Sequence, residues 1–242
     1  MARYFIELSY DGAAYHGWQV QPNAVSVQQK LNEALSLLLG AEVETVGAGR
    51  TDAGVNAAMM VAHFDGEVED EKQLTYRLNR ILPRDIAVKK VWKVSDDMHA
   101  RFSAKSRTYH YFVTTEKSPF HRHYAYQLPF EVDFGKMNDA AEILLETSDF
   151  TSFSKLHTDV KTNICHVSEA IWTEIEPNYW RFTITADRFL RNMVRAVVGT
   201  LLEVGRGRMT KPELQEIIEK KNRSAAGDSV PGNALFLTKI IY

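Results

Sequence analysis

The stretch YFIELSYDG, residues 4–12, begins the pattern that decides the fold. Its apolar and aromatic residues alternate along the chain, which predicts a strand that ends at the turn pair Asp11-Gly12. Ser26 and Gln29 then have the spacing of a capping box, and Gly40 stands where a helix of that phase would end. This segment therefore predicts a strand followed by an amphipathic helix.

The same kind of pattern continues through the next fifty residues. Alternating apolar positions predict a strand over 58–64, and Asp70 is placed to cap a helix that Pro83 stops. That helix is expected to bury its apolar residues Leu74, Leu78, Ile81 and Leu82. A further strand is expected over 86–91. The order strand, helix, two strands, helix, strand is the ferredoxin-like pattern.

A looser version of this order follows in the second part of the chain. The spacing predicts a strand at 109–113, a helix at 137–145, a hairpin over 171–184 and a long helix at 189–204. A short helix with the capping box Thr210–Glu213 and a last strand, 235–241, complete it. We therefore expect two related α+β halves, residues 1–105 and 106–242.

Composition limits the classes of protein and the compartment. The 242 residues are 45% hydrophobic and 25% charged, and the net charge of -2 offers no overall attraction to nucleic acid or membrane. A single cysteine, Cys165, excludes an internal disulfide. No apolar run approaches a bilayer span, and charge comes too early at the start for a signal peptide. We expect a cytoplasmic protein without a membrane anchor.

The glycine-rich stretch GAGRTDAGVNA, residues 47–57, holds the first candidate for chemistry. Asp52 occupies the position where a dinucleotide-binding fingerprint needs glycine, and no P-loop lysine follows Gly54. One interpretation is a hairpin turn in which Asp52 caps its own backbone. The other is an ionised, accessible carboxylate beside Arg50, which suits a nucleophile.

A basic stripe is expected on the helix over 189–204. At helical spacing, Arg188, Arg191 and Arg195 share one face, which could follow a row of phosphates. The alternative is an ordinary solvated stripe. Of the acidic residues that could pair along the helix, only Asp187 is well spaced, for Arg191.

A second basic run precedes an aromatic strand. Arg101, Lys105 and Arg107 adjoin Tyr109, and arginine beside an exposed ring is a combination that holds an unstacked base. Tyr111 we assign to the core. His121-Arg122-His123 has no carboxylate or cysteine spaced to complete a metal site, so no metal is expected.

Six stretches distributed along the chain share the pattern of one family. They are YDGAAYHGWQ (10–19), SVQQKL (26–31), AGRTDAGV (48–55), HARFSAKSRTYHY (99–111), DFTSF (149–153) and FLRNMVRAVVGTLLEVGRG (189–207). In this order they resemble the TruA family of tRNA pseudouridine synthases. The resemblance implies a pseudouridine synthase fold with a continuous, mostly antiparallel sheet. It implies an isomerase that converts uridine to pseudouridine at positions 38, 39 and 40 of the tRNA anticodon arm.

The resemblance also implies roles for single residues. Asp52 is the expected nucleophile and Arg50 lies beside the flipped base, while Tyr109 stacks on the uracil. Arg195 matches the basic partner of the carboxylate and Leu235 the apolar residue that closes the pocket. The family needs no cofactor and no metal, and binds tRNA as a homodimer.

This chain departs from the family pattern at two positions. Asn56 stands where many relatives have histidine, and Ala234 where glycine is usual. An alternative from another class is a catalytically silent RNA-binding protein on the same scaffold, since ferredoxin-like sheets commonly bind RNA. The carboxylate of Asp52 distinguishes the two, because a binding module does not need it.

Overall fold

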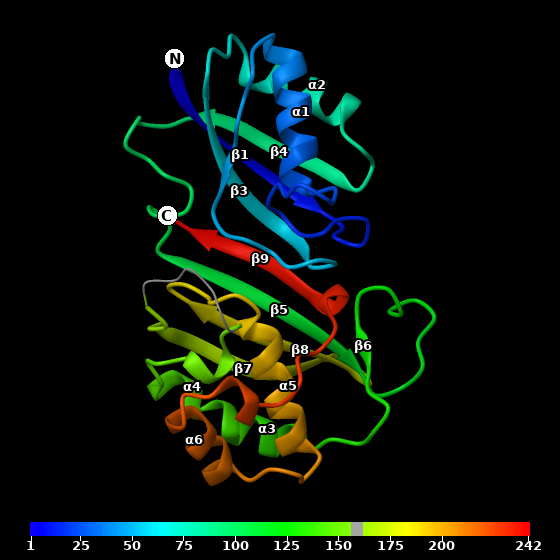
Figure 1. Ribbon diagram of the computed structural model, residues 1–242. Helices are drawn as coiled ribbons and strands as arrows, with labels where there is room; N and C mark the ends of the chain where they lie inside the picture. The colour runs from blue at the N-terminus through cyan, green and yellow to red at the C-terminus, as the bar shows by residue number, and fades with distance from the viewer. Residues whose placement is uncertain (156–161) are drawn as a thin grey trace. The chain divides into compact units, whose positions relative to one another are not determined.

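The computed structural model describes residues 1–155 and 162–242 (Figure 1). The chain divides into two compact units, Met1–Lys105 with Phe236–Tyr242, and Ser106–Leu235. Most of the last strand of the chain groups with the first unit, where Phe236 and Leu237 pair in parallel with Asn56 and Ala57.

The first unit is a sheet with two helices. Its strands have the order β4-β1-β3-β9, and β2 also pairs with β3; the pairs of β1 with β3, β1 with β4 and β2 with β3 are antiparallel. Helices α1 and α2 pack beside each other, and α2 packs against β4. The elements are β1 (Ala2–Tyr10), α1 (Val27–Leu39), β2 (Val46–Gly47), β3 (Asn56–Gly66), α2 (Glu71–Ile81), β4 (Ile86–Lys93) and β9 (Leu235–Ile241).

Local sequence signals explain both helices. As expected, the Ser26 hydroxyl accepts the Gln29 backbone N–H, and Gly40 ends α1 in the left-handed region. The side-chain amide of Gln29, which a capping box would direct back to Ser26, donates to Glu33. Asp70 caps α2 by accepting two backbone N–H groups. The expected core position Ile81 is wrong, because this last residue of α2 is 42% exposed.

The second unit also combines antiparallel strands with helices. Its strands have the order β5-β8-β7, both pairs antiparallel, with the short β6 parallel to β5. Helix α3 packs against α5 and β7. The elements are β5 (Ser106–Thr114), β6 (Tyr126–Gln127), α3 (Phe134–Ala141), α4 (Ile143–Glu146), β7 (Val167–Glu176), β8 (Tyr179–Ala186), α5 (Met193–Gly205) and α6 (Lys211–Glu219).

The long helix begins later than its apolar spacing predicts. Asn192 has a φ of 67°, in the left-handed region, so α5 begins at Met193 and not at Phe189. Arg188 and Arg191 therefore precede the helix. The expectation that they share one helical face with Arg195 is wrong, because only Arg195 is in α5.

The predicted helix over 137–145 is also different. It is two short helices, with Glu142 between them, and Leu145 is exposed.

The fold class is confirmed as a mixture of helices and mostly antiparallel sheet. The ferredoxin-like likeness of the two halves and the continuity of one sheet through both stay predictions. Within the described ranges, 1–155 and 162–242, no helix combines the length and apolar character that a bilayer crossing requires.

Candidate active site

The glycine-rich loop, Ala48 to Val55, connects β2 to β3 in the first unit. Along it Arg50 is exposed, Thr51 is buried and the side chain of Asp52 is half-buried. The buried Thr51 hydroxyl hydrogen-bonds the Tyr10 hydroxyl at 2.9 Å, and the Val55 N–H donates to the Asp52 carbonyl at 3.1 Å. The loop thus holds its centre by Thr51, and Asp52 beside it is neither fully buried nor fully exposed.

A neighbouring loop, residues 11–18, braces this turn. The Trp18 N–H donates to the Thr51 carbonyl at 3.3 Å, and the Gly54 N–H donates to the Tyr15 carbonyl at 3.2 Å. These bonds flank Asp52 on both sides in the chain. The backbone that carries the carboxylate is therefore fixed by main-chain contacts as well as by its own turn.

Two glycines make this close approach possible. A β-carbon at Gly12 would overlap the Val55 carbonyl oxygen, and one at Gly17 would overlap the Thr51 carbonyl oxygen. Gly17 also has a φ of +86°, which L side chains rarely adopt. The glycines are thus required where the two loops touch.

Asn56, one of the two expected departures from the family pattern, has a structural role. Its side-chain oxygen accepts the buried Gly12 N–H at 2.8 Å, and the residue is 1% exposed. The departure from the family pattern therefore lies in the support of the loop.

The bracing loop is itself anchored to the start of β4. The Tyr15 hydroxyl donates to the Asp85 carboxylate at 2.7 Å, and the Asp11 N–H donates to the Asp85 carbonyl at 2.9 Å. Burial, together with this hydrogen bond, raises the pKa of Tyr15. Tyr15 therefore stays protonated and keeps donating near neutral pH.

In the second unit, Tyr109 lies on β5 opposite Ile184 of β8. Its ring is 8% exposed and meets Phe189 edge to face, with centroids 5.0 Å apart and an interplanar angle of 83°. Phe189 belongs to the segment between β8 and α5. That segment, which is not helical, thus helps to orient the Tyr109 ring.

A strap, residues 227–230, crosses the first turns of α5 and holds Arg195. The Arg195 Nε donates to the Val230 carbonyl at 2.7 Å, while the Asn192 amide donates to the Ser229 hydroxyl at 2.6 Å. The close approach requires Gly199, where a β-carbon would overlap the Asp228 carbonyl oxygen. The strap thus sets the direction of the guanidinium.

The core beside Arg195 contains Tyr111, as expected. Its hydroxyl donates to the Pro231 carbonyl at 3.0 Å, and its side chain is fully buried. Burial raises the pKa of Tyr111, and the nearby positive charge of Arg195 partly opposes this shift. Tyr111 is therefore a neutral donor that ties Pro231, the residue after the strap, to β5.

Comparisons with known proteins identify what this arrangement belongs to. A family model described as tRNA pseudouridine synthase matches residues 8–103 and 140–242. The chain belongs to the tRNA pseudouridine synthase family. The expectation of an isomerase of this family is thereby confirmed.

Relatives of full length support the same family. The chain is 58% identical over 242 residues to tRNA pseudouridine synthase A of Bacteroides fragilis. This match covers 99% of this chain and 96% of the relative. It is 59% identical to that of Bacteroides thetaiotaomicron over 100% of this chain and 91% of the relative. The protein of that name from Bacillus subtilis is 42% identical over 97% of both.

The residues expected at the family's site lie in both units. Asp52 and Arg50 share one loop of the first unit. Arg101 and Lys105, both exposed, belong to the same unit but lie outside that loop. The second unit contains the other expected residues: Tyr109, Arg107, Arg188, Arg191, Arg195 and Leu235. Leu235 is the first residue of β9 and is 5% exposed, and the residue after it pairs with Asn56.

Two of the basic residues have local structural contacts at Asp187. The Asp187 carbonyl accepts from Arg107 at 2.8 Å, and its carboxylate accepts the backbone N–H groups of Arg188 and His166 at 2.7 and 2.8 Å. Asp187 and Arg191 both precede α5, so the helical spacing that was expected to pair them does not apply.

The supporting residues of the site were not predicted. Gly12, Gly17 and the strap Gly227–Val230 act through contacts between segments distant in sequence. A signal for the first two was present, because the stretch 10–19 is one of the six that resemble the family. The strap has no such signal.

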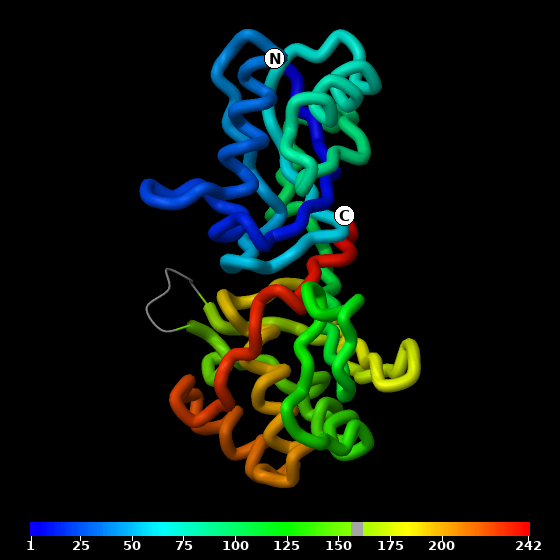
Figure 2. Tube along the Cα trace, turned by 90° about the vertical axis from the view of Figure 1, so that its right-hand side faces the viewer, coloured from blue at the N-terminus to red at the C-terminus, as the bar shows by residue number. Residues whose placement is uncertain are grey.

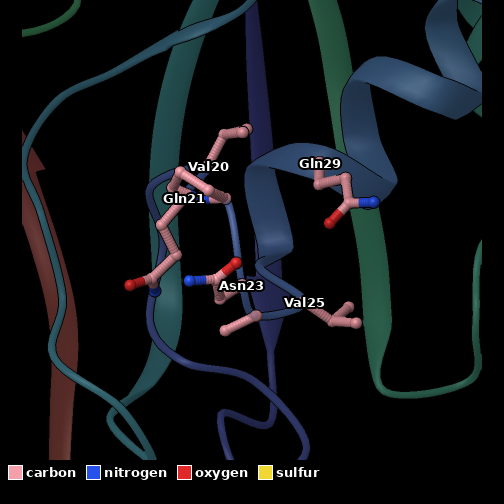
Figure 3. Close-up of a pocket in the computed structure, with 7 residues that line it drawn as sticks. Val20, Gln21, Asn23, Val25 and Gln29 are labelled. Atoms are coloured by element: carbon pink, nitrogen blue, oxygen red, sulfur yellow. The ribbon is translucent and has the colours of Figure 1, made fainter.

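A hollow of about 420 Å³ lies elsewhere in the first unit, in the segment between β1 and α1 (Figure 3). Figure 2 shows this segment as a blue projection. Its lining runs from Val20 to Val25 and includes Gln29, and contains no expected site residue. In the part of the chain that the structure describes, no group of three or more His, Cys, Asp or Glu residues is placed to hold a metal ion.

Proposed function

We propose that the chain isomerises uridine to pseudouridine at positions 38, 39 and 40 of the tRNA anticodon arm, with Asp52 as the nucleophile. The family supports a tRNA uridine as the substrate. The observation that carries the role of Asp52 is its place, half-buried, on a loop that backbone hydrogen bonds brace on both sides of it. Such preorganisation suits a group that must meet a substrate atom.

The reaction needs a nucleophile and a proton transfer. The bond between ribose C1′ and N1 breaks, a bond from C1′ to C5 forms, the proton on C5 leaves, and N1 gains a proton. No oxidant, reductant or water is consumed. An ionised Asp52 serves attack on C1′, attack on uracil C6 and a glycal route alike.

A uridine paired in a stem must leave the helix before a carboxylate can reach it. Arg50 is exposed two residues before Asp52, and its length and charge suit the space that the flipped base vacates. We propose that Tyr109 stacks on the uracil, with its ring supported by Phe189. Leu235 closes the pocket.

The basic residues complete the proposed site. Arg195, directed by the Val230 carbonyl, is the proposed ion partner of the catalytic carboxylate. Phosphate contacts are proposed for the expected basic residues of the two runs: Arg101, Lys105, Arg107, Arg188 and Arg191. A homodimer that binds one tRNA across both subunits is part of the same proposal.

Tritium release from carbon 5 tests this function. Unmodified tRNA transcripts carrying C5-tritiated uridine are incubated with the protein, alongside transcripts with cytidine at 38, 39 and 40. We expect release that falls with each substitution and disappears when all three uridines are replaced. Release that is unaffected by the substitutions would contradict the assigned positions, and tRNA binding without release would support the catalytically silent alternative.

A further inference from the structure

The loop from Lys117 to Tyr124, which connects β5 to β6, carries an exposed aromatic ring. Figure 1 shows it in green, projecting beside β6. Phe120 at its centre is 88% exposed, and Tyr124 is 42% exposed. A single exposed apolar residue is ordinary on a protein surface. The surroundings of Phe120 are what call for an explanation.

The 117–124 loop is ordered by its own contacts and not by burial of Phe120. The His121 ring stacks on Tyr179 of β8, with centroids 3.9 Å apart and an interplanar angle of 4°. The His121 carbonyl accepts N–H groups from Tyr124 and Ala125 at 3.0 and 2.9 Å. The loop therefore presents the Phe120 ring on a fixed backbone.

The loop is also tied to the segment that leads into the pocket residue. The Asn233 side-chain amide donates to the His123 carbonyl at 3.0 Å. Asn233 belongs to the turn Gly232–Ala234, which is followed directly by Leu235 at the start of β9. The exposed ring is thus coupled to the part of the second unit proposed to close over the uracil.

Positive charge accompanies the ring. Lys117 and Arg122 are exposed on either side of Phe120, and the Arg122 guanidinium donates to the Pro119 carbonyl at 3.0 Å. Glu116 precedes Lys117 in the chain, and a carboxylate oxygen of Glu176 lies 4.0 Å from the His121 Nε2. Aromatic rings flanked by cations are the surface that binds unpaired nucleotides, by stacking and by phosphate contact.

We propose that the 117–124 loop is a second contact with the tRNA substrate. Phe120 stacks on an unpaired base, and Lys117 and Arg122 bind the phosphates beside it. This inference rests on the proposed function, because it takes tRNA as the substrate. It assigns Phe120 to binding and not to the chemical step.

Substitutions at Phe120 test the role of the ring. Phe120→Trp keeps an aromatic face, Phe120→Leu keeps apolar bulk, and Phe120→Ala removes both. Tyr76→Ala, on α2, is the matched control, since Tyr76 is an aromatic residue 61% exposed. The measurements are the Kd for unmodified tRNA at one fixed salt concentration, and KM and kcat from tritium release.

Stacking predicts that the variants divide into two groups. Phe120→Ala and Phe120→Leu should each raise Kd and KM about ten-fold or more, with kcat at saturating tRNA unchanged. Phe120→Trp and Tyr76→Ala should behave as the wild type. Equal Kd and KM in all four variants would overturn the inference while leaving the proposed function intact, provided that the wild type releases tritium.

Two further outcomes have different meanings. If the wild type binds tRNA but releases no tritium, the proposed function fails, and the Kd series alone still decides whether Phe120 contacts RNA. If Phe120→Ala lowers the molecular mass measured by sedimentation without RNA, the loop is an interface between copies of this chain. That result would overturn the stacking assignment.

Discussion

At the scale of single residues, the site depends on glycines that let two loops touch. Gly12 and Gly17 lie outside the loop that carries Asp52, yet each faces a carbonyl oxygen of that loop. The glycine-rich character of residues 47–54 was visible in the sequence. The pairing of this loop with residues 11–18 was not, because it depends on a contact between distant segments.

Gly17→Ala should destabilise the protein by about 2 kcal/mol or more. The new β-carbon would overlap the Thr51 carbonyl and occupy a residue with a φ of +86°. Gly49→Ala is the control within the Asp52 loop, because a β-carbon there has no neighbour within 4 Å. Urea unfolding measures both, and equal unfolding free energies for the two variants would show that the loop contact is unimportant.

His63 gives the stability a pH dependence. It is 6% exposed on β3, its Nδ1 accepts the Ala100 N–H at 3.2 Å, and its ring contacts His99. Burial, with help from the positive charges of His99 and Arg3, lowers the pKa of His63 from 6.5 to about 4. The folded protein therefore holds the ring neutral at a pH where the unfolded chain is protonated.

Because the unfolded chain takes up this proton more readily than the folded protein, the free energy of unfolding decreases as the pH falls from about 6.5 toward about 4. Above about pH 6.5 both states hold the ring neutral, and nothing is lost. The decrease amounts to at most about 3 kcal/mol. His63→Gln keeps an acceptor but does not titrate. The difference in unfolding free energy between wild type and variant should therefore change between pH 7.5 and pH 4.5, in the direction that weakens the wild type. A difference independent of pH would contradict the assignment.

At the scale of elements, local signals predicted where most helices and strands lie. The caps Ser26, Asp70 and Thr210 each accept the backbone N–H groups expected of them, and the last strand has the bounds read from the alternation. The start of α5 was wrong because apolar spacing from Phe189 to Leu201 is compatible with a helix. The left-handed Asn192 is not apparent from that spacing.

Gly199→Ala should destabilise α5, although alanine is favoured over glycine in helices by about 1 kcal/mol. The β-carbon would overlap the Asp228 carbonyl, so the strap that holds Arg195 must move. Gly205→Ala is the matched change, because its nearest neighbour is the thioether of Met137, which can shift. Thermal unfolding should rank Gly199→Ala below Gly205→Ala; a Gly199→Ala protein more stable than wild type would refute the role of the strap.

At the scale of the whole molecule, the family could be predicted from six stretches distributed along the chain, and the family model and relatives confirm it. The net charge of -2 gave no overall evidence for a nucleic-acid partner, so any basic surface had to be local and offset by acidic residues elsewhere. The roles of the individual site residues stay predictions, since they depend on where a bound tRNA would lie.

The central claim is that the carboxylate of Asp52 carries out the chemistry. Single-turnover tritium release by Asp52→Asn, at protein concentrations above its Kd for tRNA, tests it most directly, because asparagine keeps the size of the side chain and removes the negative charge. The account predicts tRNA affinity close to that of the wild type and release at least about a thousand-fold slower. Release at the wild-type rate from the bound variant would contradict it.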